Sequence, residues 1–325
     1  MDYQPYITGS VLRTVLSGLV VLPALGFSVL VLRKPGAKHD HTRRWVDFTK
    51  IALGLWSILT PPTLFRSELL SFIYWIVITV SYAWRKNGHF SFPNELVYVY
   101  FVGGLVGYLG HVALLLAFFS LAHALTQLRN GAESDDYKAY HIGRKVVLGL
   151  SALVTLVAVA TFACEVAETV LFDILPRKDR YVPGDWDNAI RLGFAAQYMG
   201  VINIGFLFVA ALGLLGYAVV PFKTARGSPT QKASTLLLIA VSLWLITRLY
   251  SFITSIMVVT NHFWGWGPTY IGAAVVDVIL SVWPSFAALM ILYVLASDNT
   301  YSLSRLHYEE EDDEQRIWDE RTQST

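Results

Sequence analysis

The sequence has little cysteine and little charge, two features on which ordinary extracellular or soluble domains depend. Its one cysteine, Cys164, cannot form a disulfide within the chain. Only 15% of the 325 residues are charged, whereas soluble globular domains carry about 25%. Because 54% of the residues are hydrophobic, the composition favours an integral membrane protein over a soluble one.

Motifs for metals, cofactors and nucleotides are missing as well. There is no CxxC or HExxH pair, no Walker loop and no dinucleotide-binding fingerprint, so we expect no metal site and no cofactor. Asp135 and Asp136 lack the further aspartate of a DDxxD motif, which argues against diphosphate–magnesium chemistry. A formal net charge of +1 gives no basic field that would attract nucleic acid.

What the sequence does contain is a series of long apolar runs. A helix needs about 20 residues to cross a ~30 Å hydrocarbon core, and seven runs reach that length. Pro61 and Pro62 interrupt the second run, which is therefore one broken span or two shorter segments. The runs predict an all-α bundle of seven transmembrane helices with approximate ranges 11–32, 46–84, 94–128, 140–175, 186–220, 231–263 and 270–297.

Lysines and arginines in the connections predict the orientation. The odd-numbered connections carry 12 of them and the even-numbered ones carry 6. This bias places the N-terminus outside and the C-terminus in the cytosol. We expect residues 1–300 to form a transmembrane domain in an endomembrane, such as the endoplasmic reticulum, or in the plasma membrane. Residues 301–325, with the acidic run from Glu309 to Glu314, are expected to form a cytosolic tail.

Charged and polar side chains inside the spans are the candidate functional residues. Such groups are costly to insert and usually face the bundle interior or a cavity. Their positions along the predicted helices place most of them between mid-membrane and the outer third, so we expect a polar cavity that opens outward. The residues are Arg66, Glu68, His111, Glu165, Glu168, Gln197, Asn203, Arg248, Tyr250 and Asp277.

Two explanations for these residues remain open. They could be neutralising pairs that hold the bundle together, such as Arg66 with Glu68. They could instead form a site for a hydrophobic small molecule. In a sequential ring the seventh helix lies beside the first, second and sixth, so Asp277 is expected to pair with Arg66 or Arg248.

Glu165 and Glu168 are the sharpest feature of the set. They are three residues apart and therefore share one face of a helix. Two neighbouring carboxyl groups in a low dielectric cannot both ionise easily. One of them is expected to hold a proton and to act as an acid.

With its length, its seven helices and the acidic residues of its fourth and seventh helices, the chain resembles fungal membrane-bound terpene cyclases. The most similar group acts in ascochlorin, ascofuranone and macrophorin-type meroterpenoid pathways. The resemblance covers nearly the whole chain and rests on architecture together with Glu165, Glu168 and Asp277, without a diagnostic motif.

The resemblance implies a metal-independent cyclase, of isomerase or lyase type, for a prenylated substrate in secondary metabolism. A protonated carboxyl group would activate an epoxide or alkene, and the polyene would close through a carbocation. Glu165 or Glu168 would then be the proton donor, with Asp277 as the second candidate, and Arg66, His111 or Arg248 would orient the polar head. The alternative is a fungal-type seven-helix sensor or lipid-handling protein.

Overall fold

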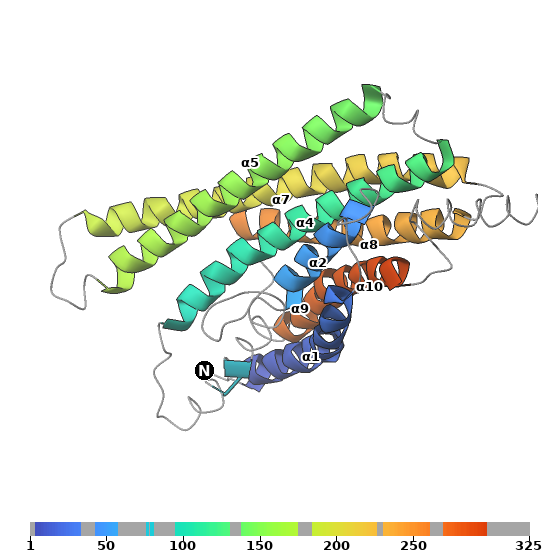
Figure 1. Ribbon diagram of the computed structural model, residues 1–325. Helices are drawn as coiled ribbons and strands as arrows, with labels where there is room; N and C mark the ends of the chain where they lie inside the picture. Colours follow the sequence, from blue (N-terminus) through green and yellow to red (C-terminus); the bar gives the residue numbers. More distant parts are fainter. Residues whose placement is uncertain are drawn as a thin grey trace, which may run out of the picture.

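The computed structural model describes residues 4–33, 43–57, 76–77, 79–80, 95–130, 138–174, 184–225, 230–260 and 269–297, and this part of the chain forms helices without a strand. The acidic tail lies outside the described residues. Two π-helical turns, η3 (Val170–Ile174) and η4 (Val278–Val282), continue α5 and α9. The α-helices are α1 (Gln4–Leu32), α2 (Arg44–Ser57), α4 (Glu95–Asn130), α5 (Lys138–Thr169), α7 (Asp185–Thr224), α8 (Gln231–Val259), α9 (Thr269–Asp277) and α10 (Trp283–Ser297) (Figure 1).

Within the described ranges, six helices are long and apolar enough to cross a membrane. They cover Ile7–Leu30, Phe101–Gln127, Tyr140–Phe172, Asp185–Thr224, Gln231–Val259 and Ile271–Ser297. Each coincides with a predicted span, so six of the seven predictions are confirmed. For the remaining span, predicted over 46–84, the structure describes α2 at its start, whereas Pro61, Pro62, Arg66 and Glu68 lie outside the described residues.

The first helix begins earlier than predicted. We expect it from the sequence to start at residue 11, but α1 begins at Gln4. Pro5 does not prevent this, because proline is tolerated in the first turn of a helix, where its missing N–H has no partner to lose. The earlier start places Arg13 well inside the helix.

The centre of the bundle is α4, the span with the largest buried share. It packs against α2, α5, α7 and α8, which run beside it in Figure 1. Phe118 of α4 meets Trp244 of α8 in this core, with ring centroids 5.8 Å apart. Both side chains are fully buried.

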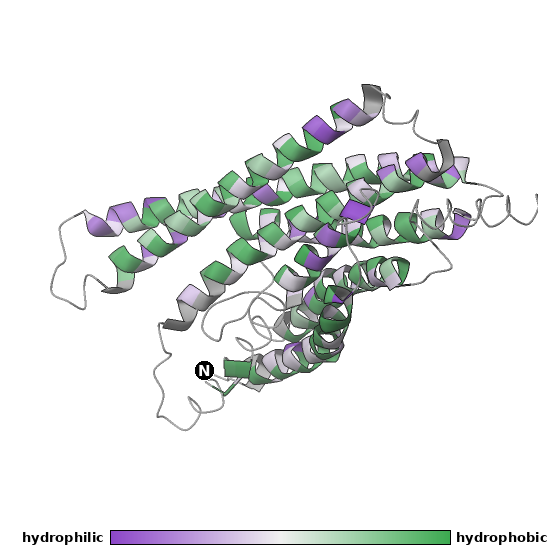
Figure 2. Cartoon of the chain, viewed as in Figure 1, coloured by the Kyte–Doolittle hydropathy of each residue, from purple (hydrophilic) through white to green (hydrophobic). Residues whose placement is uncertain are grey.

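The outer faces of the helices are apolar. Leu19, Leu156 and Val209 are each more than 60% exposed, and hydrophilic residues gather toward helix ends in Figure 2. Apolar surface this extensive is unusual on a soluble monomer and typical of contact with lipid. The protein is therefore a multi-pass membrane protein.

The last span consists of α9, η4 and α10. It packs against α1, α2 and α8, as predicted for the seventh helix of a sequential ring. Pro284 has no N–H to donate to the carbonyl of Leu280, and the π-helical turn lies directly before it. The turn changes the direction of the side chains just after Asp277.

Candidate functional site

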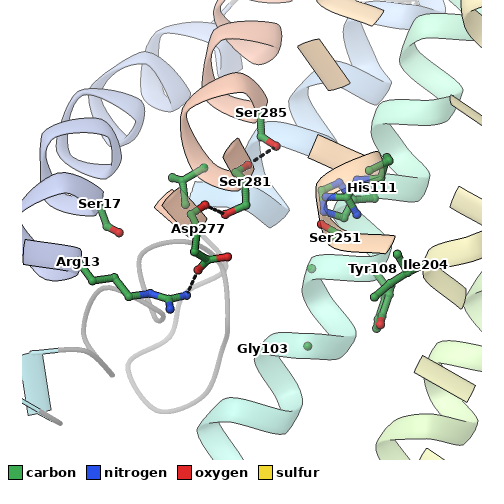
Figure 3. A pocket seen from close by; sticks show the side chains of 14 residues that line it. Arg13, Ser17, Gly103, Tyr108, His111, Ile204, Ser251, Asp277, Ser281 and Ser285 are labelled. Atoms are coloured by element: carbon green, nitrogen blue, oxygen red, sulfur yellow. Dashed lines mark hydrogen bonds and ion pairs between the residues drawn. The ribbon is translucent and has the colours of Figure 1, made fainter. Parts of the chain in front are cut away.

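A cavity of about 300 Å³ lies between α1, α4, α7, α8 and the last span. Its described lining residues all belong to membrane-spanning helices, so the cavity is inside the bundle and not in a loop. Figure 3 shows its two sides, with Arg13 and Asp277 on one side and α4 on the other. The lining residues are Arg13, Ser17, Gly103, Gly104, Gly107, Tyr108, His111, Ile204, Arg248, Ser251, Asp277, Ser281, Val282 and Ser285.

An ion pair at the cavity joins α1 to α9. Nη2 of Arg13 forms an ion pair with Oδ2 of Asp277 (Figure 3). The two side chains are 25% and 27% exposed, so the pair is mostly shielded from solvent. The sequence predicts Arg66 or Arg248 as the partner of Asp277. The structure pairs Asp277 with Arg13, and Arg66 lies outside the described residues.

The sequence prediction missed Arg13 for a physical reason. A helix that starts at residue 11 would place this arginine at the membrane boundary, where a long cationic side chain can reach water without a partner. The signal that could have found it is the apolar stretch that continues on both sides of Arg13.

Serines of η4, α10 and α8 line the cavity. The hydroxyl of Ser281 donates to the carbonyl of Asp277, and that of Ser285 donates to the carbonyl of Ser281 at 2.9 Å. On α8, the hydroxyl of Ser251 donates to the carbonyl of Thr247 at 2.9 Å. These bonds commit the hydrogens of Ser251 and Ser281 to the helix backbone, whereas the hydroxyl of Ser285 also donates to Oγ1 of Thr247 on α8 at 3.4 Å.

His111 and Arg248 face each other across the α4–α8 contact. Both line the cavity, and they are close enough for the charge of Arg248 to act on the imidazole. Nε1 of Trp244 donates to Nδ1 of His111 at 3.5 Å. Tyr250, also on α8, lies close enough to Asp277 and Arg13 to interact with both charges.

One wall of the cavity is nearly bare backbone. Gly103, Gly104 and Gly107 of α4 line it, followed by Tyr108. Without side chains, this stretch lets a bound molecule approach the helix closely. The sequence signal was a Gly-Gly-x-x-Gly pattern in an otherwise bulky apolar helix, which the prediction did not use.

Three of the predicted site residues, His111, Arg248 and Asp277, are therefore brought together at the cavity, with Tyr250 beside them. Glu165 and Glu168 are on α5, and no described α5 residue lines the cavity. Gln197 and Asn203 are on α7 but are not among the lining residues. Asn203 is fully buried, and neither of its amide atoms has a hydrogen-bond partner among the described residues.

Glu168 has a separate environment at the α5–α7 contact. Its carboxyl group packs onto the backbone of α7 at Gly193, where an added Cβ atom would lie 2.5 Å from Oε1. The glycine thus provides the space that the carboxyl group occupies. The π-helical turn Val170–Ile174 begins two residues after Glu168.

In the part of the chain that the structure describes, no group of three or more His, Cys, Asp or Glu residues could hold a metal ion. Comparison of the chain with protein-family models, curated proteins and solved structures gives no match.

Proposed function

We propose that the protein is a membrane-bound terpene cyclase that closes a prenylated, meroterpenoid-type substrate by protonating an epoxide or alkene. One observation carries the proposal beyond the resemblance: a carboxyl group, that of Asp277, lines a cavity inside the membrane-spanning bundle together with His111 and Arg248. A hydrophobic substrate can enter such a cavity from the bilayer. A substrate that fills the cavity would keep water away from a carbocation and so protect it from being quenched.

In this proposal Asp277 is the acid. As the partner of Arg13 it is a carboxylate, so it first leaves the guanidinium and takes up a proton from water at the cavity. This proton then moves to the epoxide oxygen, the C–O bond breaks, and the electrons of the nearest alkene form a new C–C bond. Loss of a proton from the final cation then gives a product that is an isomer of the substrate. The phenol ring of Tyr108, which lines the cavity, offers an aromatic face for the cation.

Arg13 has a role in the same scheme. While it is bound to Asp277, the carboxyl group cannot approach a substrate oxygen freely. A phenol or carbonyl group on the substrate head can take the place of Asp277 on the guanidinium, because both present oxygen acceptors. Binding of the substrate would thereby separate the Asp277 carboxylate from Arg13 and let it take up the proton that it then delivers.

The test is an activity assay on microsomes that contain the protein. Farnesylated phenols and their terminal epoxides are supplied, and products are followed by mass and retention time. A new product with the mass of its substrate, absent with Asp277→Asn, supports the proposal. No conversion of any substrate by protein verified to be in the membrane contradicts it.

The alternative function is a seven-helix sensor, and the ion pair that ties α1 to α9 favours considering it. A ligand that separates Arg13 from Asp277 would loosen the contact between two helices, which is one way to start a conformational switch. Deletion of the residues after Arg305 distinguishes the two functions. A cyclase keeps its turnover without the acidic tail, whereas a sensor that signals through the tail is silenced.

The orientation belongs to the proposal as well. The excess of lysine and arginine in the odd-numbered connections supports an outside N-terminus and a cytosolic C-terminus in an endomembrane or the plasma membrane. Single cysteines placed in the connections of a Cys164→Ser protein and labelled from each side test this arrangement. Labelling of the N-terminus from the cytosol would reverse it.

A further inference from the structure

One hydrogen bond determines which tautomer of the His111 ring is present at the cavity. Nε1 of Trp244 lies 3.5 Å from Nδ1 of His111. An indole N–H can donate but cannot accept, so Nδ1 is the acceptor and carries no hydrogen. The single ring hydrogen of His111 must then be on Nε2.

Nε2 is the ring nitrogen of His111 that a molecule bound in the cavity can contact. His111 lines the cavity together with Ser251, across from Arg13 and Asp277 (Figure 3). No hydrogen bond joins Nε2 to another residue in the described part of the chain. Trp244 and a bound molecule can therefore use the two ring nitrogens at the same time.

The groups around His111 limit what can be placed against it. Tyr108 of α4 lies on its side of the cavity, and Arg13 and Asp277 form the opposite side (Figure 3). Arg248 of α8 is close enough for its charge to act on the ring. Ser251 and Ser281 donate their hydrogens to the helix backbone, so Nε2–H is a neutral donor in a cavity whose charged donors are Arg13 and Arg248. An amine or another N–H donor of a ligand would place its hydrogen against the hydrogen of Nε2, which is unfavourable. A ligand oxygen would instead accept the Nε2–H hydrogen bond.

We infer that His111 acts as a neutral hydrogen-bond donor to an ether, epoxide or carbonyl oxygen of the substrate, and that Trp244 is the positioning residue that holds this tautomer. The inference rests on the proposed function in taking the cavity as the substrate site. In the cyclase reaction, His111 transfers no proton. Its N–H stabilises the epoxide oxygen while Asp277 supplies the proton and the C–O bond breaks.

The tautomer can be observed directly. The full-length protein is labelled with ¹⁵N-histidine and placed in lipid nanodiscs, and the signal of His111, one of 8 histidines, is assigned by its loss in His111→Gln. We expect a hydrogen bonded to Nε2 and none on Nδ1, with a mixture of tautomers in Trp244→Phe. A hydrogen on Nδ1 of the wild-type protein overturns the inference.

Turnover of a farnesylated phenol with a terminal epoxide tests the donor role. Glutamine places an amide N–H near the position of Nε2, so we expect His111→Gln to keep activity within about tenfold of wild type, while His111→Leu loses about 100-fold. Equal losses in two well-folded variants would show that Nε2–H is not the group that matters.

Trp244→Phe is compared with a matched variant. Phenylalanine keeps a ring against Phe118 but cannot donate to His111, and we expect about tenfold lower turnover. Trp283→Phe removes an indole N–H that donates to the carbonyl of Leu16 and should leave turnover unchanged. Equal effects of the two variants would assign Trp244 a purely structural role.

The two proposals fail in different ways. A wild-type protein that converts no probe contradicts the cyclase function, while the nitrogen spectrum still decides whether His111 is the neutral donor. Turnover with an Nδ1–H tautomer supports the cyclase and refutes the role given to His111 and Trp244.

Discussion

Arg13 and Asp277 form an ion pair between α1, the first described helix, and α9, which begins the last membrane span. The pair lies at the wall of the cavity, and its two side chains are largely shielded from solvent. It therefore links the closing of the helix ring to the chemistry proposed for the site.

The contribution of the ion pair to stability is measured by a double-mutant cycle. Arg13→Gln and Asp277→Asn should each lower the free energy of unfolding by about 1–3 kcal/mol, between the values for exposed and buried pairs. The double variant should lose less than the sum, because the second change removes a group that has already lost its partner. The measurement is thermal unfolding in detergent. Losses that add up in the double variant would show that the two residues do not interact.

The identity of the acid is decided by three nearly isosteric variants. Asp277→Asn should reduce turnover by about 100-fold or more, as expected for loss of a general acid. Glu165→Gln and Glu168→Gln should stay near wild type, because α5 contributes no described residue to the cavity wall. The reverse result, with a loss only in a glutamate variant, would move the acid to α5 and restore the assignment first made from the sequence.

Gly193→Ala tests Glu168 without changing the glutamate itself. The new methyl group would occupy the space of the carboxyl group, which must move. Since the carboxyl group is the flexible end of the Glu168 side chain, the free energy of unfolding should change by less than about 1 kcal/mol. We expect turnover to stay at the wild-type level. Gly213→Ala, a change on the same helix with no atom near the new methyl group, is the control, and a loss of turnover confined to Gly193→Ala would give Glu168 a function.

Filling the cavity should block the site and leave the fold intact. Gly107→Leu adds a side chain at the bare wall of α4, and the added atoms compete with substrate for a cavity of about 300 Å³. We expect KM to rise or turnover to disappear while the thermal unfolding temperature stays within a few degrees of wild type. Gly213→Leu, which adds the same side chain on an open, exposed helix face, should behave as wild type. Unchanged kinetics in Gly107→Leu would place the substrate site elsewhere.

The helices could be predicted from the sequence because a lipid environment leaves the backbone few choices. Polar backbone groups in a bilayer must bond within the segment, so an apolar run of sufficient length becomes a helix. The starts and ends agree closely, as for α7 (Asp185–Thr224) against the predicted 186–220. The exception is α1, which includes polar residues before residue 11 and therefore begins earlier than predicted from its apolar run.

The candidate site could be predicted only in part. Asp277, His111 and Arg248 were recognised because an ionisable side chain in a span stands out against its apolar neighbours. The same rule selected Glu165 and Glu168, which the structure places away from the cavity, and it passed over Arg13 and the glycines of α4. Arg13 and the glycines of α4 matter because of where they lie relative to other helices, and no single run of sequence contains that information.

The sequence by itself determined which segments cross the membrane and which polar side chains lie within it, because both depend on local composition and the length of each run. Only the tertiary structure decided which of those side chains meet. The rotation of each helix about its own axis is set by packing against its neighbours. That rotation turned Asp277 toward Arg13, turned His111 toward Trp244, and placed the carboxyl group of Glu168 against Gly193.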